Sequence, residues 1–162
     1  MVIQLVSYKT TLRADSRLRH TAEIINSSKA DMILFAGHTL ASHRDIDELN
    51  TLVDNDKTTA VIEVKENAIS VLNPVCNSLF LLRNGMVKDM FTHQLFSDSK
   101  NISTYHELGE HLMLELETRR NFSVANRNVS IIQCGENNIL RNIQSEGNRP
   151  VFRFEDDSIM NQ

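Results

Sequence analysis

The order of hydrophobic and polar positions divides the first half of the chain into alternating strands and helices. Apolar runs of strand length lie at residues 2–8, 30–36, 59–64, 68–72, 78–83 and 86–91. Between the first three runs, apolar residues recur every three or four positions, which predicts helices over residues 15–28 and 44–54. Asp15 is the expected N-cap of the first helix. Residues 30–36 are apolar nearly throughout, as in a parallel strand covered on both faces.

The second half of the chain is less regular. Asn84-Gly85 separates two apolar runs and predicts a β-hairpin, since both residues tolerate positive φ. Residues 103–119 show helical spacing of leucines, and residues 121–127 form a turn-rich or short-strand connection to a strand beginning at Val129. One or two helical turns are expected over residues 138–143. We expect one domain over residues 1–162, with an irregular tail from about residue 145 in which only residues 151–154 are candidates for regular structure.

Composition narrows the function classes. The 162 residues are 41% hydrophobic and 23% charged, which is ordinary for one globular domain. A net charge of −4 gives no overall basic field, so nucleic acid is not an expected partner. No apolar segment is long enough to span a membrane. Cys76 and Cys134 are far apart and outside any CxxC pattern, which favours a reducing, cytoplasmic compartment.

The stretch from Val129 to Gly135 is the main candidate for chemistry, because an apolar run ends in Cys134 and a glycine. A strand that ends in this way delivers a side chain to the edge where open α/β sheets place their sites. We expect this strand to run parallel to and beside the strand that ends at Phe35, so that the two strand ends share a crevice. Cys134 is then a candidate nucleophile, which needs a base or a lowered pKa. The alternative is a buried packing cysteine, because free cysteine is among the most buried residue types.

Other common signatures are absent. The sequence contains no G-x-S-x-G, P-loop or G-x-G-x-x-G pattern, so no nucleotide cofactor is expected. His106 and His111 flank two glutamates, but they are five residues apart and would point about 140° apart on a helix. A zinc-binding helix needs its histidines four residues apart. We therefore expect no metal site.

The succession of elements resembles the N-terminal part of the nitrilase, or carbon–nitrogen hydrolase, superfamily. The segments that carry this resemblance are residues 30–35, 77–87, 95–96 and 129–136. The resemblance implies part of an α-β-β-α sandwich, a mixed sheet flanked by helices, because the later elements of the family would lie beyond Gln162. An apolar sheet face left without those elements must be buried against something, so we expect a homo-oligomer.

The resemblance also assigns a catalytic set, which is incomplete here. Cys134 takes the place of the cysteine that attacks a nitrile or amide carbon, and Glu136 that of the acidic residue which commonly follows it. Gly37 stands where the family has its glutamate base, and the family lysine falls near Thr92. Losing a base or a positioned cation costs roughly 10² to 10⁴ in rate.

Two functional hypotheses follow. The first is a non-catalytic nitrilase homologue or interaction module. The alternative is an active carbon–nitrogen hydrolase, acting on a small amide or nitrile, in which Cys134 works with a substitute group. The candidates for that group are Glu136, His38 and His93, since histidine titrates near neutral pH.

Overall fold

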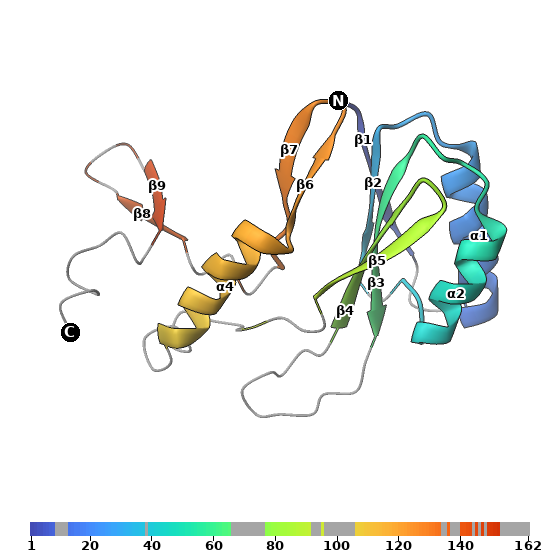
Figure 1. The fold of residues 1–162 in the computed structure, drawn as a ribbon, viewed down its shortest axis with the longest axis horizontal. Helices are drawn as coiled ribbons and strands as arrows, with labels where there is room; N and C mark the ends of the chain where they lie inside the picture. Colours follow the sequence, from blue (N-terminus) through green and yellow to red (C-terminus); the bar gives the residue numbers. More distant parts are fainter. Residues whose placement is uncertain are drawn as a thin grey trace.

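A computed structural model describes residues 1–8, 13–37, 39–65, 77–91, 95, 106–133, 136, 140–143, 145, 147 and 149–152. Over these residues the protein is a mixed α/β structure built on a five-stranded sheet with the order β1-β2-β3-β4-β5 (Figure 1). Its strands are β1 (Ile3–Ser7), β2 (Met32–Ala36), β3 (Thr59–Lys65), β4 (Asn77–Arg83) and β5 (Met86–Phe91). The expected α/β class with a mixed sheet is confirmed.

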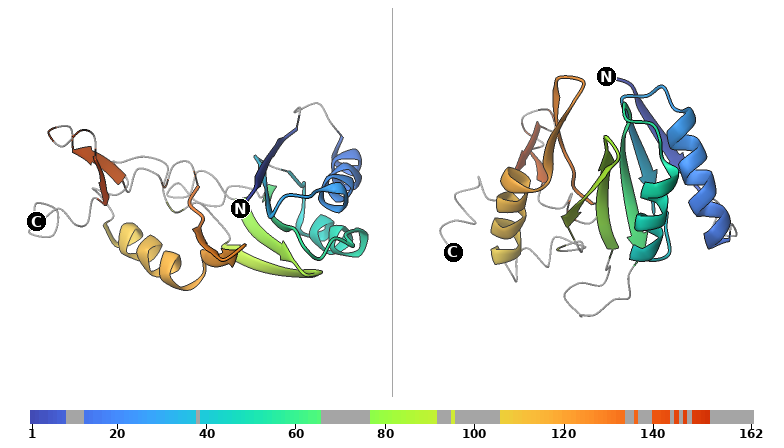
Figure 2. Two further views of the ribbon diagram at one scale, coloured as in Figure 1. Left: turned by 90° about the horizontal axis from the view of Figure 1, so that it is seen from above. Right: turned by 45° about the vertical axis from the view of Figure 1, so that its right-hand side comes forward.

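The sheet is parallel at one side and antiparallel at the other. β1, β2 and β3 are parallel neighbours, whereas β4 and β5 continue the sheet in antiparallel order. Helices α1 (Ala14–Ser27) and α2 (His43–Leu52) connect the parallel strands, as the apolar spacing predicts. Both helices lie on the same face of the sheet (Figure 2). The β-α-β-α-β prediction is therefore confirmed.

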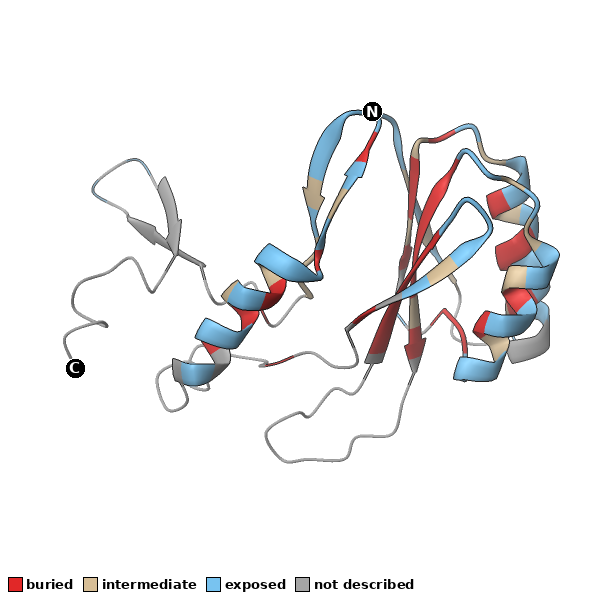
Figure 3. Cartoon of the chain, in the orientation of Figure 1, coloured by how far each residue is buried: buried red, intermediate tan, exposed pale blue. Residues whose placement is uncertain are grey.

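The main hydrophobic core lies between these two helices and the sheet. Ile25 of α1, Leu49 of α2 and Ile62 of β3 are almost completely buried in it. The buried side of each helix faces the sheet, and its exposed side faces solvent (Figure 3). Alternate residues of the strands supply the sheet side of this core, because successive side chains point to opposite faces.

The two helix starts differ from each other. Ser42 and Asp45 form a reciprocal capping box at the start of α2. The N-cap of α1 is Arg13, which makes no side-chain capping bond, so the prediction that Asp15 caps this helix is wrong. Because α1 already begins at Ala14, Asp15 is a residue of the helix and not the residue that precedes it.

The opposite face of the sheet carries a second, smaller core. Val61, Leu79 and Leu81 of the sheet are buried there together with Val124. Val124 belongs to a separate hairpin of β6 (Asn121–Val124) and β7 (Arg127–Ser130), which follows helix α4 (His106–Thr118). α4 and the hairpin lie on the side away from α1 and α2 (Figure 2). The second face of the sheet is therefore covered over its β2–β5 part.

The predicted β4–β5 hairpin is confirmed at its turn. Asn84 and Gly85 have φ values of 53° and 68°, the left-handed region that a two-residue turn requires. An asparagine and a glycine adopt this region at lower cost than other residues. The turn sets the β4–β5 register, in which Arg83 pairs with Met86.

The C-terminal part departs from the sequence pattern. Residues 140–143 form strand β8 (Leu140–Ile143), so the prediction of helical turns there is wrong. β8 pairs with β9 (Arg149–Phe152), which overlaps the candidate stretch at residues 151–154 and begins earlier in the segment expected to be irregular. Cross-strand pairing supplies hydrogen bonds that local sequence signals did not reveal. The predicted strand at residues 68–72 lies outside the described residues.

The first strand of the sheet leaves apolar side chains in solvent. β1 pairs only with β2 among the described strands. Ile3 and Leu5 are 44% and 76% exposed, whereas Val6 packs against the main core. Because side chains alternate along a strand, Ile3 and Leu5 lie on the sheet face that carries the second core, but outside the buried cluster of that core.

Candidate functional site

The predicted site residues are only partly within the described structure. Cys134, His38 and His93 lie outside the described residues, so their predicted roles stay predictions. Glu136 is described and completely buried. Gly37 follows β2 with a φ of 51° and its backbone is exposed, and it brings no charge to the position of the family glutamate.

The carboxylate of Glu136 is fully engaged by protein donors. Its Oε1 accepts hydrogen bonds from the backbone N–H of Leu95 at 2.8 Å and from Nη2 of Arg120 at 3.1 Å. Its Oε2 accepts from Nη1 of Arg120 and from the backbone N–H of Gln133 at 2.9 Å. A carboxylate offers about four lone-pair positions, and four donors fill them here.

Arg120 joins Glu136 to a second carboxylate. Its Nε donates to Oε2 of Glu115 at 2.8 Å, and its Nη2 lies 2.6 Å from the same oxygen. Arg120 is completely buried and Glu115 is 7% exposed. His111, on the same helix as Glu115, reaches the other carboxylate oxygen at 3.2 Å. We call Arg120, Glu115 and Glu136 the buried ion cluster.

The buried ion cluster ties separate parts of the chain together. Glu115 belongs to α4, Arg120 lies just before β6, and Glu136 follows the segment that leaves β7. The carbonyl of Arg120 also accepts a hydrogen bond from the backbone N–H of Ile131 at 3.2 Å. Because buried charges need partners, the cluster fixes the positions of these segments.

One prediction about the site is wrong. The strand beginning at Val129 was expected to run parallel and adjacent to the strand that ends at Phe35. In the structure β2 has β1 on one edge and β3 on the other, so neither edge is open to a further strand. β7 instead pairs with β6 and ends at Ser130. Gln133, which follows this hairpin, therefore meets the sheet across its face, at Glu63.

The contact with Gln133 brings Glu63 into the candidate site. The sequence analysis did not identify Glu63. The side-chain Nε2 of Gln133 donates to Oε1 of Glu63 across 3.4 Å, although the two residues are 70 positions apart. Glu63 lies on the same face of β3 as Val61, which packs in the second core. A single carboxylate in the otherwise apolar stretch from Ala60 to Val64 was the available signal.

The chain returns to β3 shortly after Gly37. Leu40 forms an isolated parallel bridge with Val64, and its N–H donates to the carbonyl of Glu63 at 3.2 Å. Thr39, directly before Leu40, is completely buried, and its hydroxyl has no hydrogen-bond partner. Polar side chains from three separate segments thus gather at the C-terminal end of β3.

A histidine–serine pair lies near the same end of the sheet. Nε2 of His43 is 3.0 Å from Oγ of Ser78, a spacing at which a histidine can activate a hydroxyl. Ser78 is completely buried, and the His43 ring packs edge-on against Phe80 of the main core. We regard the pair as a structural contact, because a buried hydroxyl cannot reach a substrate.

The metal prediction concerned the helix that contains His106 and His111. His111 pairs with Glu115, which also binds Arg120. Across the described residues, no group of three or more histidine, cysteine, aspartate or glutamate side chains could hold a metal ion. The helices of the described part include none that is long and apolar enough to cross a membrane.

Comparisons with protein-family models, with curated proteins and with solved structures each found no match. The kinship with nitrilases therefore stays a prediction from the segments quoted above.

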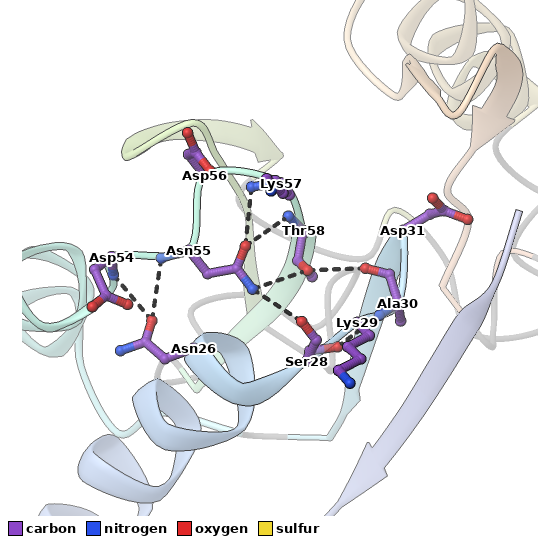
Figure 4. A pocket seen from close by; sticks show the side chains of 10 residues that line it. All are labelled: Asn26, Ser28, Lys29, Ala30, Asp31, Asp54, Asn55, Asp56, Lys57 and Thr58. Atoms are coloured by element: carbon purple, nitrogen blue, oxygen red, sulfur yellow. Dashed lines mark hydrogen bonds between the residues drawn. The ribbon is translucent and has the colours of Figure 1, made fainter.

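A polar hollow of about 660 Å³ lies at the opposite end of the sheet, between the loops that precede β2 and β3 (Figure 4). The side chain of Asn55 lines it, donates to the carbonyls of Ile25 and Ser28, and accepts from the backbone N–H groups of Lys57 and Thr58. These bonds join the two loops. The polar groups of Asn55 are thus used to hold the fold.

Proposed function

We propose that this chain is a nitrilase-like protein that keeps the cysteine of the nucleophile position and acts as a non-catalytic homologue or interaction module. The observation that carries this proposal is the hydrogen bonding of the Glu136 carboxylate. Four donors already fill the lone-pair positions of its carboxylate, two of them from Arg120. If Glu136 took a proton from a thiol, its carboxylate would lose its charge and its ion pair with Arg120 in a buried position.

The position of Gly37 supports the same proposal. The resemblance places the family glutamate there, and a glycine supplies neither a base nor a charge. A missing base costs roughly 10² to 10⁴ in rate, and the absence of the charge-stabilising lysine, whose position falls near Thr92, costs about as much. Together, the two losses remove most of the rate enhancement expected of a carbon–nitrogen hydrolase.

The exposed apolar part of β1 supports an interaction role. Leu5 is 76% exposed and Ile3 is 44% exposed on a sheet face whose buried part lies under the β6–β7 hairpin. We infer that this protein forms a homo-oligomer, with no role for nucleic acid or membrane, in a reducing, cytoplasmic compartment. Sedimentation analysis should give a dimer or larger species at micromolar concentration. A monomer at that concentration contradicts the oligomer.

Thiol labelling tests the loss of catalysis. The two cysteines are separated with the single variants Cys76→Ser and Cys134→Ser, each labelled by a maleimide between pH 6 and pH 9. A non-catalytic protein should label at Cys134 no faster than at Cys76. An activated thiolate reacts well below pH 8, because the thiolate is the reactive form. Faster labelling of Cys134 below pH 8 would overturn the proposal.

A second candidate function is favoured by the contact between Gln133 and Glu63. Gln133 directly precedes Cys134, so this contact brings a carboxylate from β3 to the end of the cysteine segment. In an active carbon–nitrogen hydrolase, Glu63 would take the thiol proton as the sulfur adds to an amide carbon. It would return that proton to the leaving ammonia, and water would then cleave the thioester.

The variant Glu63→Gln tests this second candidate. Its side chain has the same size and cannot accept the thiol proton. If Glu63 is the base, labelling of Cys134 below pH 8 should slow about tenfold or more, and any release of ammonia from small amides should stop. Glu48→Gln, an exposed change on α2, is the matched control. Equal labelling rates in the two variants exclude Glu63 as the base.

A further inference from the structure

The outer edge of β1 presents main-chain groups that no other described strand pairs with. β1 has β2 on one side, and no described strand lies on its other side. The carbonyl of Val2 accepts a hydrogen bond from the N–H of Met32 at 3.2 Å and so points toward β2. Because the main-chain groups of successive residues point to alternate edges of a strand, Ile3, Leu5 and Ser7 present their N–H and C=O groups outward. Such a row of groups is a template for a further strand.

The two edges of the sheet differ in how far they resist such pairing. Proteins usually block an edge with lysine, with proline or with a β-bulge. β5, the other edge strand, contains the exposed Lys88, and its register with β4 shifts between Leu79 and Phe80. β1 contains no charged residue and no proline, and its register with β2 runs from Ile3 to Ser7 without a shift. β1 is therefore the edge that can accept a further strand.

The outer side chains of β1 would also be stabilised by such pairing. Ile3 and Leu5 are 44% and 76% exposed, and Ser7 is exposed as well. Ile3 and Leu5 lie on the sheet face that carries the second core. A strand added beside β1 would cover part of their apolar surface and extend this core past the present edge of the sheet.

The charge of the chain favours a second copy of the chain as the added strand. Each copy has a net charge of −4, so two copies repel each other and meet at the lowest cost along an uncharged strip. Residues 3–7 form such a strip, and they offer no charge by which a different partner could be selected. In an antiparallel pair with a two-fold axis at Leu5, Ile3 of each copy lies opposite Ser7 of the other, and Leu5 lies opposite Leu5. This arrangement uses the outward N–H and C=O groups of all three residues.

We propose that two copies of this chain pair antiparallel through β1 and join their sheets into one continuous sheet. The proposal rests on the homo-oligomer inferred above and names its interface. A two-fold pairing is closed, because each copy uses the same surface, so this interface gives a dimer.

A charge placed at Leu5 tests the proposal by sedimentation velocity on the full chain. Leu5→Lys places two lysines opposite each other across the axis, and like charges in this position destabilise a strand pair. The dissociation constant of the dimer should rise about tenfold or more. Met86→Lys, at a 69% exposed residue of the other edge strand, is the matched control and should leave this constant unchanged. Circular dichroism checks that both variants are folded. An unchanged constant in folded Leu5→Lys protein overturns the proposal.

A mixing experiment tests whether the two copies meet at Leu5 itself. Leu5→Glu should weaken the dimer as Leu5→Lys does. An equimolar mixture of the two variants should dimerise again, because opposite charges then face each other across the axis. A mixture that stays monomeric at concentrations where the unmodified chain is dimeric overturns the two-fold pairing.

The proposed function and this interface fail separately. Thiol labelling of Cys134 decides whether the protein is catalytic and does not depend on how its copies associate. A dimer that withstands Leu5→Lys keeps the homo-oligomer and overturns its β1 interface alone. A monomeric unmodified chain leaves the β1 edge to a different partner and overturns both the homo-oligomer and the interface.

Discussion

Replacing Arg120 by methionine should strongly destabilise the protein. The side chain of Arg120 is completely buried and is hydrogen-bonded to both Glu115 and Glu136. Methionine fills similar space but carries no charge and no donor. The variant therefore leaves two carboxylates in the interior without their shared cation.

The expected loss of folding stability depends on the hydrogen bonds that each carboxylate keeps when Arg120 is replaced. Glu136 retains the N–H groups of Leu95 and Gln133, so half of its four hydrogen bonds survive. Glu115 retains its contact with His111. Removing one partner of a buried ion pair costs about 3–5 kcal/mol, and we expect Arg120→Met to fall in this range. That is a large part of the 5–15 kcal/mol by which domains are usually stable.

Urea unfolding followed by far-ultraviolet circular dichroism measures this loss, since the chain has no tryptophan. The neighbouring exposed change Arg119→Met is the control and should alter the free energy of unfolding by less than about 0.5 kcal/mol. A triple variant, Arg120→Met with Glu115→Met and Glu136→Gln, should recover most of the loss, because it removes the stranded charges.

Glutamine at position 136 is chosen because its carbonyl oxygen can still accept from the two backbone N–H groups. The reasoning is refuted if Arg120→Met costs less than about 1 kcal/mol, as an exposed ion pair would. It is also refuted if the triple variant is no more stable than the single one.

Three further predictions concern the main core, a helix start and a tyrosine. Leu49→Ala should cost about 2–5 kcal/mol in urea unfolding because Leu49 is fully buried, whereas Leu52→Ala on the same helix, with a 41% exposed leucine, should cost much less. Ser42→Ala breaks the capping box of α2 and should cost about 1 kcal/mol; an unchanged unfolding midpoint would show that the box is not stabilising. Burial raises the pKa of Tyr8 above its usual 10.0, against the hydrogen bond with Thr21 that lowers it. This contribution to stability is present below pH 10 and is lost as pH rises through the folded-state pKa, so Tyr8→Phe should flatten the fall in stability measured from pH 9 to pH 12.

The sequence predicted the first half of the fold well because its signals are local and agree with one another. Residues 30–36 are apolar throughout, and they became β2 with parallel neighbours on both edges. Asn84-Gly85 formed the expected turn. Periodicity, turn residues and strand length all indicated the same structure in these segments.

The second half was predicted less well because pairing between distant segments decides it. Residues 140–143 show no strong alternation, and they form a strand because β9 lies beside them. β7 was assigned to the wrong partner, since an apolar run predicts a strand and does not say which sheet it joins. Local pattern gives the element, whereas tertiary contacts give its neighbours.

The carboxylates of Glu136 and Glu63 also show that local sequence does not reveal the tertiary neighbours of a side chain. Glu136 is two residues from Cys134 and was one candidate to replace the missing base, but Arg120 and two backbone N–H groups occupy its carboxylate. Glu63 is 70 residues from Gln133 and yet touches it. A carboxylate is available for chemistry only when its partners leave a lone pair open, and those partners are set by the fold. The functional question therefore turns on the fold around Cys134, and Glu63→Gln tests whether the carboxylate that contacts Gln133 activates its thiol.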